Sequence, residues 1–373
     1  MKKILIVSNM YPSRRYPSYG VFVKNFCDQL KSLGYDFDLS VITKTSNRAV
    51  KILKYLGFYA STFFRCLSGK YDLVYVHYPS FSAAPVNLAR KIRKFKLITN
   101  VHGTDVVPLK KEHEQMLGHT KTAIDFSKMV VVPSAYYKAL VMEKYGIEES
   151  RVFVYPSGGV HENVFFPYDA EIRRSKRAEF GVAEESFVLG FVSRINKAKG
   201  WDVFIEAIKQ SQLLMKTEAR ILIVGSGEDD ALLSKEIESL PKRLKDAVIR
   251  FPLLDQGRLA DIYNILDVFL FPTTSASESL GLVALEAMSC GVPVIASDYA
   301  APAYYVNNGE NGYKFAMGNS SELAQTLDRF MALSEEQIMV LKKGALETAH
   351  QYARKTIVTE LNQLLDTMQK SSE

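Results

Sequence analysis

Two glutamates lie on either side of a predicted helix start. Glu278 precedes Gly281 by three positions, and Glu286 falls eight positions after Glu278 in a helix-favouring run. The first backbone N–H groups of a helix carry positive partial charge and suit a phosphate or sugar hydroxyls. Eight helical residues span about 12 Å, whereas the carboxylates of glycoside hydrolases stand about 5–9.5 Å apart. The pair is therefore expected to contact different parts of one long ligand, unless both glutamates are incidental to an ordinary strand–helix unit.

Two cations follow a predicted buried strand in the second half of the chain. Arg194 and Lys199 lie in the segment Ser193–Gly200, between the strand Phe187–Val192 and a predicted helix. Parallel sheets bind their ligands at the carboxyl ends of strands. A guanidinium fork and an ammonium point charge at such an end suit a diphosphate. The simpler alternative is a solvated basic loop.

His102 and Gly20 are the corresponding candidates in the first half. His102 ends the predicted strand Leu97–His102, and a lone histidine is usually a hydrogen-bonded structural residue. Gly20 joins the first strand to the first helix, where it would let a backbone approach a phosphate or an acceptor, or would simply form a turn. The segment Gly225-Ser-Gly227 lacks the third glycine of a dinucleotide motif and is interpreted as a turn near the nucleotide.

These segments resemble the motifs of one enzyme family. The run Glu278–Glu286 matches the E-x7-E motif of retaining GT-B glycosyltransferases of family 4, and its continuation through Ala287–Val294 fits the same pattern. The segment Ser193–Gly200 is similar to the family's G-R-x4-K-G motif, with a serine in place of the first glycine. The segment His102–Asp105 is similar to its H-G-x-D motif. The resemblance covers essentially the whole chain.

The resemblance implies a role for each candidate. Glu278 would lie at the transferred sugar, and Glu286 would bind the ribose of the sugar nucleotide. Arg194 and Lys199 would hold the diphosphate and stabilise its charge as the bond to the sugar breaks. His102 would contact the donor sugar, and it is not assigned as a proton-transferring base. The further donor-binding residues expected on this basis are Gly20, Ser279, Leu280, Gly281, Leu282 and Val283.

Strand and helix signals alternate along both halves of the chain, which predicts an α/β fold with parallel sheets covered on both faces. This organisation agrees with the GT-B architecture, in which two doubly wound Rossmann-like domains face each other across a cleft. The predicted domains are an N-terminal acceptor-side domain, residues 1–160, and a C-terminal nucleotide-sugar-binding domain, residues 167–351. The resemblance implies that a final helix, residues 352–373, packs back on the first domain. The other predicted strands are Ile4–Ser8, Phe37–Thr43, Leu73–His77, Met129–Pro133, Val152–Pro156, Arg220–Val224, Val248–Phe251, Val268–Phe271 and Val292–Ala296.

Composition limits the classes of protein. The 373 residues suit two domains of ordinary size, and the chain contains no run of about 18 uncharged apolar residues that would predict a transmembrane helix. Its first residues predict a strand rather than a signal peptide. Three widely spaced cysteines suit a reducing cytosol. No metal-ligand spacing appears, so neither a metal nor another cofactor is expected.

The charge is uneven along the chain. Residues 1–166 contain 24 Lys/Arg against 12 Asp/Glu, whereas the remaining residues contain 23 against 29. Residues 48–70 hold five basic residues, no acidic ones and many large apolar side chains, and a second basic run spans residues 90–96. This pattern favours a helix that lies on an anionic membrane surface over an ordinary packed helix. Nucleic acid is not an expected partner, because the basic residues are not interleaved with stacking aromatics on one platform.

Together these features predict a cytoplasmic retaining hexosyltransferase, peripheral on the inner face of the cell membrane. It would move a hexose or N-acetylhexosamine from a nucleotide sugar, UDP-linked rather than GDP-linked, to a hydroxyl of a glycan or lipid-linked acceptor in bacterial lipopolysaccharide or capsule synthesis. The alternatives are a sugar-nucleotide epimerase, which would need no acceptor, and a catalytically silent sugar-nucleotide-binding subunit. A dehydrogenase would need a full G-x-G-x-x-G after the first strand, which the segment Ser8–Gly20 lacks. The sequence does not identify the base of the donor, the sugar, the acceptor or the linkage.

Overall fold

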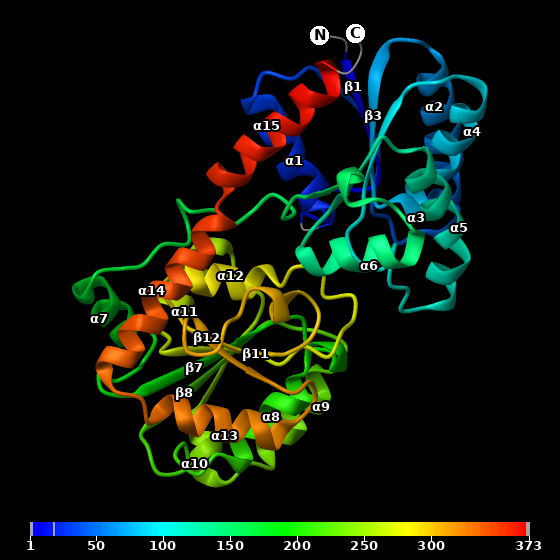
Figure 1. Ribbon diagram of the computed structural model, residues 1–373. Coiled ribbons are helices and arrows are strands. Elements are labelled where there is room, and N and C mark those ends of the chain that lie inside the picture. Colours follow the sequence, from blue (N-terminus) through cyan, green and yellow to red (C-terminus); the bar gives the residue numbers. More distant parts are fainter. Residues whose placement is uncertain (1–2, 18, 371–373) are drawn as a thin grey trace. The chain divides into compact units, whose positions relative to one another are not determined.

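The computed structural model describes residues 3–17 and 19–370, and the chain divides into two compact units. The N-terminal unit comprises residues 1–158 together with 357–373, and the C-terminal unit comprises residues 159–356. Residues 1–2, residue 18 and residues 371–373 of the predicted final helix lie outside the described residues. Each unit contains one six-stranded parallel sheet with helices on both faces (Figure 1). The predicted α/β fold with two doubly wound domains is confirmed within each unit.

The central strands of the N-terminal unit are buried on both faces. In space the strands follow the order β2-β1-β3-β4-β5-β6, and every neighbouring pair is parallel. The order reverses between β1 and β3, so the carboxyl ends of these two strands form the switch point of this sheet. The strands are β1 Lys3–Tyr11, β2 Phe37–Thr43, β3 Tyr71–His77, β4 Lys96–Asn100, β5 Met129–Val132 and β6 Val152–Val154.

Helices cover the two faces of this sheet in separate layers. Successive side chains of β1 point to opposite faces, so Ile6 packs with Phe26 of α1, whereas Val7 packs with Phe58 of α2. The helices of this part of the chain are α1 Val21–Ser32, α2 Arg48–Leu67, α3 Pro79–Ser82, α4 Ala84–Ile92, α5 Lys111–Phe126, α6 Ala135–Tyr145 and the 3₁₀ helix η1 Glu149–Arg151.

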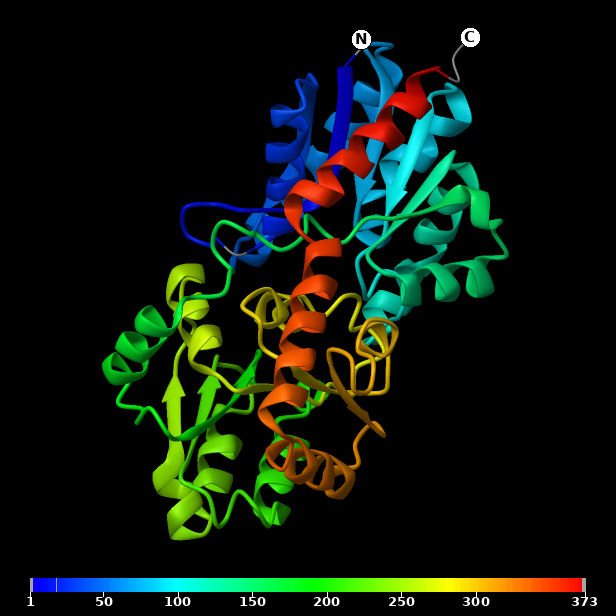
Figure 2. The same cartoon turned by 60° about the vertical axis from the view of Figure 1, so that its left-hand side comes forward.

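The last helix joins the core of the N-terminal unit although it comes from the far end of the sequence. This helix, α15 Arg354–Lys370, lies beside α1 (Figures 1 and 2). Its residues Leu361 and Leu365 are buried in the same cluster as the apolar face of α1. The hydroxyl of Tyr35, which follows α1, donates a hydrogen bond of 3.0 Å to the carboxylate of Asp366.

The sheet of the C-terminal unit has the strand order β12-β11-β10-β7-β8-β9, again with parallel neighbours. This is the order of dinucleotide-binding folds, and it reverses between β7 and β10. The strands are β7 Phe187–Val192, β8 Ala219–Val224, β9 Val248–Phe251, β10 Val268–Phe271, β11 Val294–Ser297 and β12 Gly312–Phe315.

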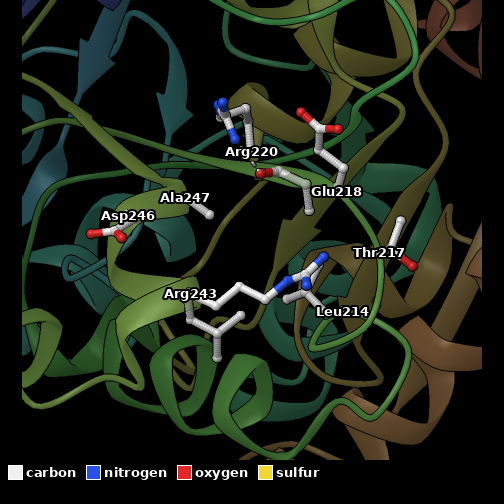
Figure 3. A pocket seen from close by; sticks show the side chains of 9 residues that line it. Leu214, Thr217, Glu218, Arg220, Arg243, Asp246 and Ala247 are labelled. Carbon is white, nitrogen blue, oxygen red and sulfur yellow. Dashed lines mark hydrogen bonds between the residues drawn. The ribbon is translucent and has the colours of Figure 1, made fainter.

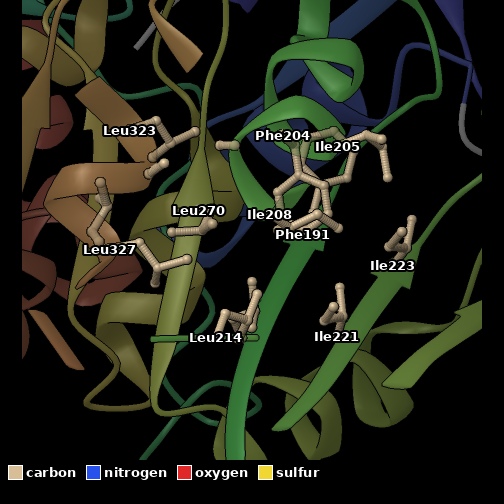
Figure 4. Packing of buried hydrophobic residues seen from close by; sticks show 14 of the residues in the cluster. Phe191, Phe204, Ile205, Ile208, Leu214, Ile221, Ile223, Leu270, Leu323 and Leu327 are labelled. Carbon is tan, nitrogen blue, oxygen red and sulfur yellow. The ribbon is translucent and has the colours of Figure 1, made fainter. Parts of the chain in front are cut away.

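An extensive apolar core lies between this sheet and its helices, including α8 and α13. Figure 4 shows Phe191 and Ile221 of the sheet packed with Phe204 of α8 and Leu323 of α13. The helices of the unit are α7 Ala170–Glu179, η2 Lys197–Lys199, α8 Trp201–Gln210, α9 Asp230–Glu238, α10 Lys242–Ala247, α11 Gln256–Ile265, α12 Leu282–Ser289, η3 Ala301–Tyr304, α13 Ser320–Met331 and α14 Glu335–Gln351.

Two features of this sheet differ from the sequence prediction. The strand predicted to begin at Val292 begins at Val294, because Pro293 has no N–H group to join the ladder. The edge strand β12 was not predicted. Its four residues include a glycine and a lysine, which are both depleted in strands, so its sequence signal is weak.

We expect Leu361→Ala to destabilise the N-terminal unit by about 2–5 kcal/mol, because it removes a fully buried side chain. Trp201 is the only tryptophan and lies in the C-terminal unit, so its fluorescence reports on that unit, whereas far-UV circular dichroism reports on both. On urea unfolding, the dichroism transition should begin at lower urea while the fluorescence transition stays in place. The control is Leu253→Ala, at a side chain that is 78% exposed. Equal shifts of both signals would contradict the place of α15 in the N-terminal unit.

Candidate functional site

The sequence candidates of the C-terminal unit meet at the switch point of its sheet. The strands β7 and β10 are neighbours there. The loop after β7 carries Arg194 and Lys199, and the loop after β10 leads to Glu278. Doubly wound sheets bind their ligands at this position, at the carboxyl ends of the strands. The fold thus gathers residues that are far apart in the sequence.

Lys199 and Glu278 form an ion pair. The Nζ atom of Lys199 lies 2.6 Å from Oε2 of Glu278, and the hydroxyl of Thr273 donates to the same oxygen at 3.4 Å. Glu278 is buried, and a buried carboxylate without a partner is strongly destabilising. The sequence interpretation gave the two residues separate roles at the diphosphate and at the sugar. The structure adds that they are in direct contact.

The ion pair depends on the close approach of two loops. The N–H group of Thr274 donates to the carbonyl of Ala198 at 3.0 Å. Gly200 has a φ of 76°, and a Cβ at this position would lie 1.8 Å from the carbonyl oxygen of Pro272. Only glycine combines this backbone conformation with this contact. Gly200, which follows Lys199 in the motif, therefore lets the loop with Lys199 pack directly against the end of β10.

Arg194 is exposed at the same edge of the sheet. In the part of the chain that the structure describes, its guanidinium has no hydrogen-bonding or ionic partner. Its loop lies on the G-x-G turn after β8. A Cβ at Gly225 would lie 1.9 Å from the carbonyl oxygen of Ser193, and one at Gly227 would lie 2.1 Å from that of Ile195. The turn supports the loop of Arg194, and the arginine remains free to bind an anion.

The start of α12 presents free backbone donors. Gly281 precedes the helix, and no side chain caps its first turn. Over residues 3–17 and 19–370, no acceptor is found for the N–H groups of Gly281, Leu282 and Val283. Free N–H groups at a helix start form a site for an anion or for hydroxyl groups. Ser279 is partly exposed beside them, but Leu280 is 3% exposed, so only its backbone could reach a ligand.

Glu286 is buried within α12, where it has different neighbours from Glu278. Its carboxyl group accepts a hydrogen bond of 3.3 Å from the hydroxyl of Tyr263. Burial raises the pKa of Glu286 to about 8, although the hydrogen bond from Tyr263 acts in the opposite direction. A protonated carboxyl can both donate and accept hydrogen bonds, which suits hydroxyl groups. The assignment of Glu286 to a ribose stays a prediction.

In the N-terminal unit, His102 lies beside a second histidine that the sequence analysis did not single out. Atom Nδ1 of His77 lies 3.0 Å from Nε2 of His102, and the two rings are stacked. Phe22 of α1 packs on His102 with 4.2 Å between the ring centroids. Burial lowers the pKa of both histidines, so both rings are neutral at pH 7 and one must donate to the other. The tautomers of His77 and His102 are therefore coupled, because only one of the two facing nitrogens can carry the proton.

Asp105 closes the turn that carries His102. Its buried carboxylate accepts the N–H groups of His102 at 3.0 Å and of Gly103 at 2.7 Å. These bonds end β4 at Asn100, two residues before the predicted end at His102. Burial raises the pKa of Asp105 to about 6, against the effect of the two N–H groups. The H-G-x-D segment is thus a closed turn that holds His102 in place.

Gly20 lies immediately before α1, packed against the backbone of Met10 and Tyr11. A Cβ at this position would lie 2.6 Å from the carbonyl carbon of Met10. This packing by itself requires a glycine. Contact between Gly20 and a ligand stays a prediction.

Figure 3 shows a surface pocket elsewhere on the C-terminal unit, lined by residues that include Leu214, Arg220 and Arg243. It lies at the amino end of β8, whereas ligands of doubly wound sheets bind at carboxyl ends. The guanidinium of Arg243 already donates to the carbonyl of Lys216. We therefore do not place the ligand in this pocket.

The structure also bears on metal sites, on the cysteines and on membrane-spanning helices. Among the described residues, no group of three or more His, Cys, Asp or Glu side chains could hold a metal ion. Cys27, Cys66 and Cys290 are buried free thiols. Within the same residues, every helix is too short or too polar to span a bilayer.

Sequence reasoning missed three residues of these sites. His77 had a usable signal, since it ends a predicted strand next to the strand that leads to His102. Tyr263 reaches Glu286 from α11, and the hydroxyl of Tyr305 donates to the carbonyl of Gly281 at 3.3 Å. Neither tyrosine stands in a motif, so only the packing of α11 and of the segment after η3 identifies them.

Comparison with known protein families assigns the chain to a family of glycosyltransferases. Residues 20–159 match the sequence profile described as "Glycosyltransferase Family 4", and residues 172–347 match the profile "Glycosyl transferases group 1". The protein therefore belongs to the group 1, family 4 glycosyltransferases, which confirms the family predicted from the motifs.

Characterised relatives share moderate identity with the chain. N-acetyl-alpha-D-glucosaminyl L-malate synthase of Bacillus anthracis is 25% identical over 68% of this chain and 63% of its own length. D-inositol 3-phosphate glycosyltransferase of Paenarthrobacter aurescens is 30% identical over 70% of this chain and 64% of its own length. The chain thus spans slightly under two thirds of both relatives. The structure of Anabaena HepE in complex with UDP and glucose has a TM-score of 0.74 at 20% identity, covers 98% of this chain and all of its own, and shows the same fold.

We expect Glu286→Gln to weaken the pH dependence of the stability of the C-terminal unit. The unfolded carboxyl releases its proton near 4.5, whereas the folded one keeps it to about pH 8. Between these values the folded state binds more protons, so the free energy of unfolding falls as the pH rises. The glutamine variant should lose part of this fall, measured by urea unfolding with Trp201 fluorescence from pH 5 to pH 8. The control is Glu185→Gln, at an exposed glutamate. An unchanged slope in Glu286→Gln would show that this carboxyl does not keep its proton.

Proposed function

We propose that the protein is a retaining hexosyltransferase that moves a hexose or N-acetylhexosamine from a UDP-sugar to an acceptor hydroxyl. The observation that carries the proposal is the Lys199–Glu278 ion pair at the switch point, next to the free N–H groups of α12 and the unpaired Arg194. The family assignment supports the transfer of a sugar. The complex of Anabaena HepE with UDP and glucose supports UDP as the carrier.

The charges at this edge suit the diphosphate of such a donor. Arg194 would bind phosphate oxygens as a fork, and Lys199 would add a point charge. The N–H groups at the start of α12 would receive further oxygens. Two cations and a helix start together offset the charge of the diphosphate, so we propose that neither a metal nor another cofactor takes part.

In the proposed reaction, the bond between the anomeric carbon and the phosphate oxygen breaks, and the acceptor oxygen bonds to the same face of that carbon. The acceptor proton passes to the departing phosphate oxygen. The products are a glycoside and UDP, and no further reactant is consumed. Glu278 would stabilise the positive charge that develops on the sugar ring, while Arg194 and Lys199 would stabilise the leaving group. The neutral ring of His102 suits a hydrogen bond to the donor sugar rather than proton transfer.

For the acceptor we propose a hydroxyl of a glycan or a lipid-linked saccharide, as used in bacterial surface polysaccharide synthesis. The two relatives are named for L-malate and for D-inositol 3-phosphate. Both compounds carry a hydroxyl group and at least one anionic group. The excess of 24 Lys/Arg over 12 Asp/Glu in residues 1–166 supports an acceptor that is likewise anionic, such as a lipid-linked saccharide with its phosphate groups.

Arg194→Ala should lower turnover by about 10²–10³-fold, because it removes one contact to a developing negative charge. Lys199→Ala should do the same and also lower the melting temperature, because it leaves the buried Glu278 unpaired. The assay measures UDP release and glycoside formation with UDP- and GDP-sugars in the presence of a chelator. Lys197→Ala is the control, since Lys197 is an exposed lysine of the same loop. Near-normal turnover in Arg194→Ala would remove the diphosphate assignment, and conversion of the donor without an acceptor would indicate an epimerase.

Glu278→Gln should mainly reduce kcat, whereas Glu286→Gln should mainly raise the KM for the donor. The reason is that Glu278 lies in the ion pair with Lys199, whereas Glu286 is buried against Tyr263. Loss of an interaction made only in the transition state appears in kcat, and loss of uniform binding appears in KM. Steady-state kinetics with varied donor concentration separates the two. The same kinetic change in both variants would refute this division of roles.

A further inference from the structure

One surface of the N-terminal unit takes no part in the proposed site. The inner side of α2 is buried in the core through Phe58 and Cys66. Its outer side is apolar as well, with Leu53, Leu56 and Phe64 exposed by 67%, 62% and 68%. The outer side of a surface helix is normally polar or charged. The apolar outer side of α2 therefore indicates contact with something other than water.

The neighbouring helix extends this surface. Helices α2 and α4 pack against each other. On α4, Leu88 and Ile92 stand one turn apart and are exposed by 54% and 66%. We call the surface formed by these two helices the α2–α4 face. Its exposed large apolar side chains include Ile52, Leu53, Leu56, Phe64, Leu88 and Ile92.

The charged residues of α2 and α4 themselves are all basic. Four basic residues here are exposed: Arg48 and Lys51 on the first turns of α2, Lys91 in the last turn of α4, and Lys94 just after that helix. Within the described residues, none of these four side chains has an ionic partner. Residues 48–70 contain no acidic residue. Two other cations of α2 are already occupied, since Lys54 donates to Thr43 and Arg65 donates to the carbonyl of Leu39.

We propose that the α2–α4 face binds the surface of an anionic lipid bilayer, with α2 lying in the plane of the headgroups. Large apolar side chains flanked by free cations are the features of helices that lie in a membrane interface. The 20 residues of α2 would extend about 30 Å along the surface. A symmetric dimer through this face would bring together two surfaces of the same charge, so an anionic partner fits better than a second copy.

Flotation of the full-length protein with vesicles tests the proposal. The protein should float with phosphatidylglycerol vesicles at low salt, should be released at high salt because charge is screened, and should not float with phosphatidylcholine vesicles. Absence of flotation with phosphatidylglycerol at low salt would overturn the proposal. Light scattering after gel filtration gives the oligomeric state. A dimer that is lost in Leu53→Asn/Leu56→Asn would assign the face to a second copy instead.

Two double variants separate the apolar and the charged contributions to vesicle binding. Leu53→Asn/Leu56→Asn should lower vesicle affinity more than about tenfold, since leucines leave water on binding. Arg48→Ser/Lys51→Ser should lower it about fivefold for each charge removed. The controls on the C-terminal unit are Leu253→Asn and Lys242→Ser, both at exposed positions, which should float like the unmodified protein. Because all these side chains are exposed, melting temperatures should not change. Unimpaired flotation of the double leucine variant would contradict the assignment to this face.

Discussion

The ion pair between Lys199 and Glu278 is the contact on which the site of the C-terminal unit depends. It joins the loops that follow β7 and β10, two strands that are neighbours only because the sheet order reverses between them. The loops can approach because Gly200 has no side chain to meet the carbonyl of Pro272. The ion pair thus depends on both the strand order of the sheet and the close approach of these two loops.

The candidate site residues differ in solvent exposure and in charge. Arg194 is exposed at the sheet edge, whereas Glu286 is buried with a pKa raised to about 8. His102 and His77 are held neutral, because burial lowers the pKa of both. Neutral groups that both donate and accept hydrogen bonds suit hydroxyls, whereas a free guanidinium suits phosphate. Within the C-terminal unit, the exposed guanidinium suits the diphosphate of the proposed donor and the buried carboxyl suits its ribose.

The two halves of the sequence also differ in their charge. Residues 1–166 have a large excess of basic residues, whereas the remaining residues have an excess of acidic ones. The apolar and basic residues of α2 and α4 gather on one face, although neither helix carries a residue of the candidate site. The proposed donor binding and the proposed attachment to an anionic surface can therefore be tested by separate substitutions.

The sequence by itself determined the alternation of strands and helices, the two doubly wound sheets and the motif residues at the strand ends. All three features follow from local sequence signals. Buried parallel strands appear as short apolar runs, and the glycines after them stand where the backbone conformation or a close contact excludes a side chain. The sequence did not predict the beginning of β11 or the edge strand β12. Pro293 cannot join the ladder and so delays the start of β11, and β12 is short and contains two residues that are depleted in strands. The tertiary structure alone decided that Lys199 touches Glu278, that Tyr263 reaches Glu286, and that His77 contacts His102. Each of these contacts joins side chains from separate elements, so its distance depends on how strands and helices pack, which no local pattern of residues encodes.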